Sequence, residues 1–389
     1  MLKLQEAENP ADLTRSRTRP RALSHARVAI AHDYLTTVGG AERVVLSLLR
    51  AFPDAPLFTS LYEPDRVMPE LASGLDIHVG PLNQSSMLRK NYRAAMPLLG
   101  AATNRVHVDA DVVLCSSSGW AHGISTSGRK VVYCYNPARW IYQRGEYAPM
   151  RKPLWWLMAA AMHPYLVRWD RKAARSCNRY IAISSIVARR IKRAYGVDAT
   201  VLPPPTTLDA SGRQETVDGI EPGYILCVGR LVPHKNLGEL TAAFAEMPEM
   251  RLVVVGDGPE RERLVAGATR NVTFTGRVSD EQLRWLYANC QGLVSASPED
   301  FGLTPLEAAT FGKPAVLLRF GGFLDTMREG ETAVFFGTPQ PPEIVRAVRT
   351  LASERWDTAA IEANAGRYSP ARFEHELQTI IDEELRAVR

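Results

Sequence analysis

Short apolar runs alternate along this chain with segments of helical periodicity. The runs expected to form strands are 27–32, 112–117, 130–135 and 179–184 in the first half, and 224–230, 251–256, 272–276, 292–296 and 314–319 in the second. Segments 42–52 and 280–289 carry apolar residues at helical spacing and are expected to be helices. Nearly continuous β-branched runs indicate strands covered on both faces, which is typical of parallel sheets in α/β folds.

The break between the two halves falls at 202–223, which opens near three consecutive prolines and continues with polar residues and glycine. We expect residues 27–205 to form an N-terminal Rossmann-like domain and residues 206–366 a C-terminal one. Segment 367–389 is expected to contain a helix that returns to the N-terminal domain. In doubly wound sheets ligands bind beyond the carboxyl ends of the strands, so two such domains facing each other make a cleft.

The composition is that of a soluble globular protein, with 46% hydrophobic and 23% charged residues among 389. Residues 1–26 are polar and Arg-rich, lack the apolar core of a signal peptide, and are expected to be a disordered tail. The longest apolar stretch, 154–167, is too short to span a bilayer. The five cysteines show no metal-ligand spacing and suit a reducing compartment. We therefore expect a cytoplasmic protein.

The charge is unevenly distributed. Residues 129–193 hold 15 Lys and Arg against two acids, a surplus of 13, so the rest of the chain carries about −8 of the net +5. Trp155, Trp156 and Trp169 lie in the same window, which suits contact with anionic lipid on the inner face of the cell membrane or with a phosphorylated acceptor. A solvated basic helix face is the alternative. Nucleic acid is not expected as a partner, because the chain has no RNP-type aromatic motif and no zinc spacing.

Two segments with features of an anion site follow predicted strands. Gly39 and Gly40 open the first helix, where free backbone N–H groups and missing Cβ atoms suit a phosphate. The alternative for them is an ordinary glycine turn. Arg230 and Lys235 follow the strand that ends near Gly229, and fixed cations there are what a diphosphate needs in place of a divalent metal. The alternative for this pair is surface charge near a turn.

Glu299 and Glu307 are separated by seven residues in a loop-to-helix segment. Thr304 is expected to cap the helix, with Pro305 at its first position, so Glu307 fits a capping box. A carboxylate at that place equally suits hydrogen bonds from vicinal sugar hydroxyls. Capping requires neither Glu299 nor Gly302, which weakens the purely structural explanation.

Two further loops are candidates. Gly321 and Gly322 follow strand 314–319 and open another helix, which predicts a second phosphate or sugar contact. His122 lies in a loop rich in glycine and serine after strand 112–117 and is a candidate ligand contact, with a structural role as the alternative.

Two other patterns are set aside. The segment Asp109-Ala110-Asp111 matches a metal-binding D-x-D pattern but precedes its strand, which is the wrong end of the sheet. The segment 256–259 resembles a dinucleotide fingerprint but lacks the third glycine.

Together these segments resemble glycosyltransferase family 4, a large retaining family with the α/β GT-B fold, in which two doubly wound Rossmann-like domains face a cleft. The resemblance covers nearly the whole chain after the tail. It is strongest over 224–336, where the Glu-x7-Glu stretch has Gly-Arg-Leu and Gly-Lys-Pro flanks. The first half resembles the bacterial polysaccharide branch that includes mannosyltransferases, through the segments AHDYLTTVGGAERVV, YCYNPARWIYQ, YIAISSIVARRIKRAYG and VLPPP.

The resemblance implies how the donor nucleotide is bound. Arg230 and Lys235 would bind the diphosphate and offset the charge that builds on the leaving phosphate. Gly39 and Gly40 would lie beside that diphosphate, and Glu307 would bind the ribose hydroxyls.

The resemblance also implies the contacts of the donor sugar. Glu299 would hold its hydroxyls together with the backbone near Phe301, Gly302 and Leu303, and His122 would contact the sugar from the other side. Ser184 and Ser185 would belong to the cleft wall. Two departures from the family pattern are Asp325, where many members have Glu, and the YNPARW loop, which bears on the acceptor.

The family further implies front-face attack on the donor without a metal cofactor, with the leaving phosphate drawing the acceptor's proton. GDP-mannose would be the donor, and a lipid-linked or oligosaccharide acceptor would belong to polysaccharide assembly. The alternatives left open are a UDP-sugar donor, an epimerase acting on a sugar nucleotide, and a non-catalytic sugar-nucleotide-binding protein with the same fold.

Overall fold

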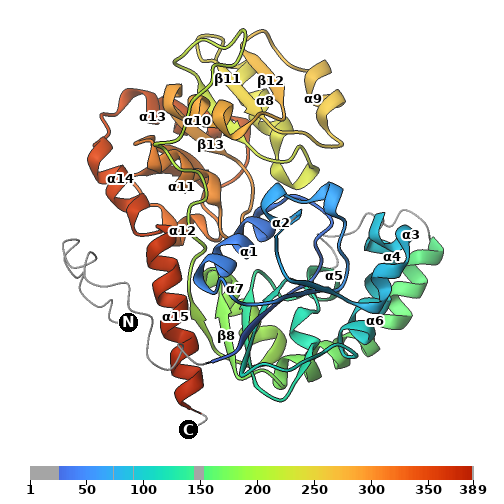
Figure 1. Cartoon of the computed structure of the whole chain (residues 1–389). Helices are drawn as coiled ribbons and strands as arrows, with labels where there is room; N and C mark the ends of the chain where they lie inside the picture. Colours follow the sequence, from blue (N-terminus) through green and yellow to red (C-terminus); the bar gives the residue numbers. More distant parts are fainter. Residues whose placement is uncertain (1–25, 73, 91, 144–152, 388–389) are drawn as a thin grey trace.

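The computed structural model describes residues 26–72, 74–90, 92–143 and 153–387, arranged as two α/β domains one above the other (Figure 1). In that view the N-terminal domain, blue to green, lies below the C-terminal domain, yellow to orange. The tail expected at residues 1–26 lies outside the described residues, apart from Ala26.

The N-terminal domain is built on a parallel sheet whose seven described strands run in the order β3-β2-β1-β5-β7-β8-β9. Ile30 of β1 pairs with Leu57 on one side and with Leu114 on the other. The strands are β1 (Val28–His32), β2 (Leu57–Thr59), β3 (Ile77–Val79), β5 (Val112–Ser117), β7 (Arg129–Cys134), β8 (Arg179–Ala182) and β9 (Ala199–Val201). A separate short pair joins β4 (His107–Val108) to β6 (Ser125–Thr126).

The C-terminal domain has a second parallel sheet, with six described strands in the order β12-β11-β10-β13-β14-β15. Leu226 of β10 pairs with Val253 and with Leu293. The strands are β10 (Ile225–Val228), β11 (Leu252–Val255), β12 (Val272–Gly276), β13 (Gly292–Ser295), β14 (Ala315–Leu318) and β15 (Ala333–Phe336). Every residue of β11 and of β14 is buried, as expected for strands with helices on both faces.

Helices cover both sheets. The helices of the N-terminal half are α1 (Gly40–Ala51), α2 (Pro69–Ala72), α3 (Ser86–Lys90), α4 (Tyr92–Thr103), α5 (Arg139–Tyr142), α6 (Pro153–Arg175) and α7 (Ser185–Tyr195), with 3-10 turns η2 (Pro64–Arg66), η3 (Pro81–Gln84) and η4 (Ala121–Gly123). Those of the other half are η5 (Pro233–Lys235), α8 (Leu237–Ala245), α9 (Arg261–Ala266), α10 (Asp280–Asn289), α11 (Leu303–Thr310), α12 (Phe323–Thr326), α13 (Pro341–Ser353), α14 (Thr358–Gly366) and α15 (Pro370–Arg386).

The nine strands predicted from the sequence are all present, with ends displaced by two residues at most. The predicted helix 280–289 coincides with α10, and 42–52 corresponds to α1. The sequence does not predict β2, β3, β9 or β15. Three of these strands, β2, β3 and β9, have only three residues each, and β3 and β9 lie at the two edges of their sheet, where side chains remain exposed.

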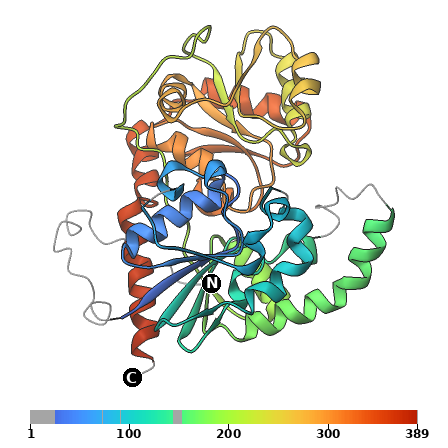
Figure 2. The same ribbon diagram turned by 45° about the vertical axis from the view of Figure 1, so that its right-hand side comes forward.

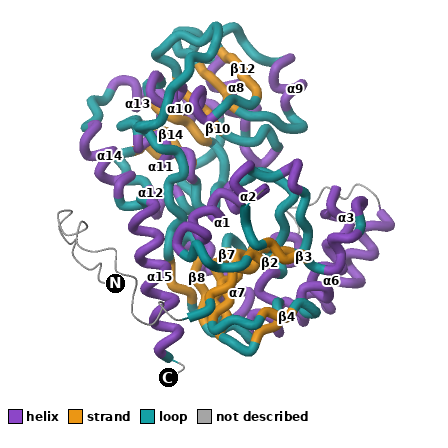
Figure 3. The backbone as a smooth tube through the Cα atoms, viewed as in Figure 1, coloured by secondary structure: helices purple, strands orange, loops and turns teal. Residues whose placement is uncertain are grey.

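The last helix, α15, runs down beside the N-terminal domain, next to α1 and β8 (Figures 1 and 3). Gln378 donates a hydrogen bond of 2.8 Å from its side-chain nitrogen to the carbonyl oxygen of Ala51 at the end of α1. The ring of Phe373 meets the ring of Tyr133 edge-on, with 5.7 Å between centroids. The last described helix therefore packs against the N-terminal domain.

Candidate active site

Two loops at the carboxyl ends of β10 and β13 bring Lys235 and Glu299 together. Asn236 adopts the left-handed conformation, and its side-chain nitrogen donates a 2.8 Å hydrogen bond to the carbonyl oxygen of Ala296. That bond ties the loop after β10 to the end of β13. The ammonium group of Lys235 donates to Oε1 of Glu299, and the hydroxyl of Ser297 donates to the same oxygen at 2.7 Å. Both predicted residues thus lie at the sheet edge where ligands of such domains bind.

The electrostatic surroundings keep Glu299 ionised. Burial by itself raises the pKa of this carboxyl, but the charge and hydrogen bond of Lys235, with help from Ser297 and Arg139, bring the pKa below its usual value. The pKa of His234 is also lowered: burial lowers it most, and the neighbouring cation of Lys235 lowers it further. The site therefore holds a fixed carboxylate and a neutral imidazole at pH 7.

The charged side chains around Lys235 and Glu299 carry more positive than negative charge. Four cations, Arg139, Arg190, Arg230 and Lys235, stand against the two carboxylates of Glu299 and Asp300, which leaves a surplus of two positive charges. Arg230 is exposed in the loop after β10, so its guanidinium is accessible to a ligand. A surplus of this size suits a diphosphate.

The capping box predicted at the start of α11 is absent. The helix begins at Leu303, and its N-cap is Gly302, which has a φ of 87° and provides no side-chain hydrogen bond. Thr304 is therefore inside the helix and does not cap it. The prediction was wrong because a left-handed glycine ends the preceding loop two residues earlier than the Ser/Thr-Pro signal indicates.

Glu307 has partners from two distant segments. The hydroxyl of Thr207 donates to Oε1 at 3.3 Å, and the hydroxyl of Tyr287 donates to Oε2 at 2.9 Å. Burial raises the pKa of this carboxyl, although both hydroxyls and the nearby Arg43 act against the rise. With 8% of its surface exposed, Glu307 lies in the wall of the interdomain region as an acceptor for hydroxyl groups.

The opening of α1, which was predicted to face an anion, lies opposite the start of α11 across the two domains. Gly39 is the N-cap of α1, and a Cβ atom added to Gly40 would lie 3.8 Å from Cδ1 of Leu303, the first residue of α11. The N-termini of α1 and α11 thus approach each other, and free N–H groups at helix N-termini attract anions. Phe301, which is buried, precedes this turn.

The glycines Gly321 and Gly322 have a structural reason to be glycines. A Cβ atom on Gly321 would lie 2.0 Å from the carbonyl oxygen of Glu299, and one on Gly322 would lie 2.2 Å from Cα of Phe301. The N–H of Gly322 also donates to the carbonyl oxygen of Glu299 at 3.0 Å. These glycines allow two loops to pack backbone against backbone, so they support the Glu299 loop.

His122 is built into the interior of the N-terminal domain. Its Nε2 lies 3.0 Å from Oδ1 of Asp170, its Nδ1 lies 3.3 Å from the hydroxyl of Ser117, and 3% of its surface is exposed. Tyr142 donates to the other oxygen of Asp170 at 2.8 Å. Both ring nitrogens thus face polar groups of the domain interior, and the burial of the ring favours the structural role over a direct sugar contact. A contact to sugar through this ring would require one of the two interactions to break.

Three aspartates organise the surroundings, and none of them was predicted from the sequence to have a role in the site, although Asp325 was noted as a departure from the family pattern. Asp33 accepts hydrogen bonds from the backbone N–H groups of Ser118, Trp120 and Ala121, which fixes the loop that contains His122. Asp325 and Asp300 instead reach across to the N-terminal domain. All three aspartates lie in or beside motifs already selected from the sequence, and this position was the one weak indication of their importance.

Asp325 caps α7 from the other domain. Its carboxylate accepts hydrogen bonds of 2.7 Å from both the N–H and the hydroxyl of Ser185. A carboxylate at a helix N-terminus is stabilised by the free N–H groups there. Ser185 and the departure from Glu at position 325 are therefore parts of one interdomain contact, whereas the hydroxyl of Ser184 accepts a hydrogen bond from the N–H of Val187 in its own helix.

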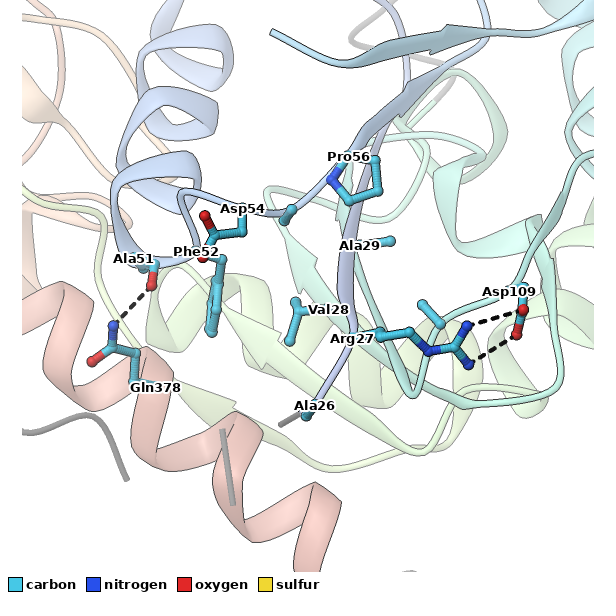
Figure 4. A pocket seen from close by; sticks show the side chains of 12 residues that line it. Ala26, Arg27, Val28, Ala29, Ala51, Phe52, Asp54, Pro56, Asp109 and Gln378 are labelled. Atoms are coloured by element: carbon cyan, nitrogen blue, oxygen red, sulfur yellow. Dashed lines mark hydrogen bonds and ion pairs between the residues drawn. The ribbon is translucent and has the colours of Figure 1, made fainter. Parts of the chain in front are cut away.

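Two hollows lie elsewhere. One, lined by Asp257, Gly258, Pro259, Arg261, Glu262 and Gly276, is at the carboxyl ends of β11 and β12, next to the Arg230 loop. The other, of about 340 Å³, lies at the opposite end of the N-terminal sheet, below β1 (Figure 4). Arg27 there holds Asp109 through two hydrogen bonds of 3.0 and 3.1 Å, so the discounted D-x-D segment is paired internally and far from the carboxyl edge.

Within the described part of the chain, no group of three or more His, Cys, Asp or Glu side chains is placed to hold a metal ion. Among the same residues, no helix combines the length and apolar character needed to cross a bilayer.

Comparison with known proteins identifies the fold and family. Residues 38–210 match the model described as Glycosyltransferase Family 4, and residues 213–368 match the model of Glycosyl transferases group 1. HepE of Anabaena, solved in complex with UDP-glucose, aligns over 92% of this chain and 100% of its own with a TM-score of 0.67 at 18% identity.

Two curated relatives are similar over about half of the chain. An uncharacterized glycosyltransferase of Bacillus subtilis, YqgM, is 26% identical over 55% of this chain and 62% of its own length. A GDP-mannose-dependent α-(1-6)-phosphatidylinositol monomannoside mannosyltransferase of Mycolicibacterium smegmatis is 28% identical over 54% of this chain and 64% of its own. The chain thus spans less than two thirds of the length of these relatives. With both family models matched in order across the two domains, the chain belongs to glycosyltransferase family 4 and has the GT-B fold.

Proposed function

We propose that this protein is a retaining glycosyltransferase that moves a hexose, with mannose from GDP-mannose preferred, to a lipid-linked or polysaccharide-precursor acceptor. The observation that carries the proposal is the cluster of Arg230, Lys235 and Glu299 at the carboxyl edge of the second sheet, facing the glycine-opened helix of the first. The surplus of positive charge there supports a diphosphate, and the adjacent carboxylate supports a sugar.

In the proposed reaction the donor diphosphate binds Arg230 and Lys235, near the N-termini of α1 and α11. The acceptor hydroxyl attacks the anomeric carbon from the side on which the phosphate leaves, and that phosphate takes the hydroxyl proton. The protein contributes positioning and fixed charge, which stabilise the negative charge growing on the leaving group. The proposal assigns no metal cofactor to this step, because the two cations supply the compensating charge.

Donor binding would also free Glu299. In the structure this carboxylate is held by Lys235, the same cation that we assign to the diphosphate. A phosphate oxygen competing for the ammonium group would leave Glu299 available to accept hydrogen bonds from sugar hydroxyls. The hollow beside Gly276 and Asp257 is the adjacent place for the nucleoside.

The first test is calorimetric titration of the protein with GDP, UDP and ADP, with and without EDTA. We expect GDP to bind most tightly and EDTA to leave the affinity unchanged, and we expect Lys235→Ala to weaken GDP binding. The support for GDP comes from the GDP-mannose-dependent relative. Preferential binding of UDP, the nucleotide part of the UDP-glucose bound in HepE, would keep the proposal of a glycosyltransferase and change the proposed donor to a UDP-sugar. Binding of none of the three would favour a non-catalytic protein with this fold.

For the acceptor side we propose peripheral contact with anionic membrane, on the cytoplasmic face, through α6 and α7. Part of the basic segment 129–193 is not available for such a contact. Arg129 and Arg179 pair with acids of α15. Trp169 packs against Gly100 and Gly123 inside the domain. The side chains of Trp155 and Trp156 lie outside the described residues.

A basic surface nevertheless remains. Helix α6 projects from the N-terminal domain (Figure 2), with Tyr165 57% exposed. The exposed cations of α6 and α7 are Arg168, Arg171, Lys172, Arg175, Arg189, Lys192 and Arg193. An exposed aromatic ring among cations suits an anionic lipid surface.

Vesicle sedimentation tests this contact. We expect binding to vesicles containing phosphatidylglycerol, none to pure phosphatidylcholine, and loss of binding at high salt. The double variant Arg168→Glu with Lys172→Glu should abolish sedimentation while GDP affinity stays the same. Equal binding of the variant and the original protein would remove α6 from the proposed surface.

A further inference from the structure

We propose that Asp300 is a positioning residue that locks the sugar-binding loop of the C-terminal domain to the acceptor-side domain, so that Glu299 reaches its working position only when the two domains are closed. The inference rests on the proposed function, since it assumes that Glu299 contacts a donor sugar. It concerns a side chain that is not expected to touch the donor itself.

Among the described residues, the hydrogen-bond partners of the Asp300 carboxylate all come from the other domain. Its carboxylate accepts hydrogen bonds from the amide of Asn136 at 2.6 Å and from the guanidinium groups of Arg139 and Arg190. These partners belong to the loop after β7, to α5 and to α7. Asp300 itself has 7% of its surface exposed, so its carboxylate is largely shielded from bulk water, whereas the Arg139 side chain remains 44% exposed. Charge-assisted hydrogen bonds of this kind are strong and directional.

Two consecutive carboxylates therefore serve different domains. Glu299 takes its cation, Lys235, from its own domain, whereas Asp300 takes Arg139 and Arg190 from the facing one. Because the two residues share one short loop, fixing Asp300 also fixes the backbone from which the Glu299 side chain departs. Gly321 and Gly322, in the loop after β14, pack against the same backbone.

Helix α7 is held at two points by the C-terminal domain. Its first residue, Ser185, binds Asp325, and Arg190, five residues later, binds Asp300. Cβ of Gly321 would lie 3.9 Å from Ile186 between these points, so the loops and the helix are in direct contact. Such a two-point attachment sets the angle between the domains as well as their distance.

If the Asp300 cluster only stabilised the protein, its loss would affect binding of GDP and of GDP-mannose alike; if the cluster positions the loop, the two affinities should change differently. The side-chain contacts assigned to the diphosphate and ribose, Arg230, Lys235 and Glu307, lie within the C-terminal domain, and the N-terminal domain is assigned only the start of α1. GDP should therefore keep most of its affinity without the lock. The sugar contact through Glu299 should need it. The inference thus predicts separate effects on binding of GDP and of GDP-mannose.

The experiment compares calorimetric affinities for GDP and GDP-mannose in the full-length protein and in Asp300→Asn. We expect the variant to keep its GDP affinity within about threefold and to lose the additional affinity for GDP-mannose by at least tenfold. We also expect X-ray scattering to show a larger radius of gyration for the variant with GDP-mannose than for the original protein with the same ligand.

Two further variants keep the test decisive. Arg139→Gln removes a partner whose side chain is 44% exposed, so it should fold even if Asp300→Asn does not, and it should shift GDP-mannose affinity in the same direction. Combined with Asp300→Asn it should add little, because the two changes break one contact. Asp280→Asn removes another interdomain ion pair, with Arg43 at 3.3 Å, and should leave both affinities unchanged.

Equal loss of GDP and GDP-mannose affinity in Asp300→Asn, or no loss of either, would overturn the positioning role while leaving the proposed function intact. An original protein that binds neither GDP-mannose nor UDP-glucose would overturn the proposed function and this inference with it.

Discussion

At the scale of single residues, the pairing of Lys235 with Glu299 is the central interaction, because it joins a cation assigned to phosphate with a carboxylate assigned to sugar. Neither residue is deeply buried, with side-chain exposures of 21% and 27%, so both are accessible to a ligand. Their role is therefore expected to be visible in catalysis more than in stability.

Replacement of Lys235 or Glu299 by Ala should abolish most sugar transfer and leave the protein folded. Loss of one well-placed charged contact costs on the order of 3 kcal/mol in the transition state, or a few hundredfold in rate. Transfer of radiolabelled mannose from GDP-mannose measures the effect, and circular dichroism checks the fold. Arg349→Ala, which removes an exposed cation paired with Glu249, is the control. Near-normal transfer by both variants would refute the assignment.

Glu307 provides a prediction about pH. Burial raises its pKa in the folded protein above the ordinary value of 4.5, so the folded state holds this proton to higher pH than the unfolded chain. The resulting stability is fully present below pH 4.5 and is lost as the pH rises through the folded pKa. Glu307→Gln, which stays neutral, should therefore raise the melting temperature more at pH 8 than at pH 4.5.

Differential scanning fluorimetry across that pH range measures the difference. The hydroxyls of Thr207 and Tyr287 can rotate to suit an amide, so the variant is expected to fold. A gain that increases toward acid pH would contradict the raised pKa.

At the scale of elements, the start of α11 depends on Gly302. This residue has a φ of 87°, and a Cβ atom there would lie 2.2 Å from Cε1 of Phe323. Gly302→Ala should destabilise the protein by about 2–5 kcal/mol, since the left-handed backbone and the crowded ring each contribute. Urea unfolding measures the change. Gly366→Ala, at a glycine with open space around it, should cost nothing comparable.

At the scale of the whole molecule, the C-terminal helix stabilises the N-terminal domain. Leu377 of α15 is completely buried and belongs to the core cluster that includes Val44 and Leu114 of that domain. Leu377→Ala should destabilise it by about 2–5 kcal/mol.

Hydrogen exchange locates this effect. Amides of α1, β5 and β7 should exchange faster in Leu377→Ala, while those of β11 and β14 should change little. Thr379→Ala, on the exposed side of the same helix, is the control. Faster exchange confined to the C-terminal domain would show that α15 serves the domain that precedes it in the sequence.

The sequence by itself determined nine of the strands, the two-sheet architecture and the family, because burial on both faces leaves continuous apolar runs and the ligand loops follow them directly. It also selected Arg230, Lys235, Glu299 and Glu307 as candidates, since their motifs are local. Periodicity cannot assign partners that lie far apart along the chain.

Those partners were decided by tertiary structure alone. Asp300 meets Arg139 at a separation of 161 residues, and Glu307 meets Thr207 at a separation of 100. The burial of His122 against Asp170 and the packing of Gly321 against Glu299 depend likewise on how elements stack. A local pattern specifies which groups stand at the end of a strand, and only the packing of the sheets and domains specifies which groups face one another.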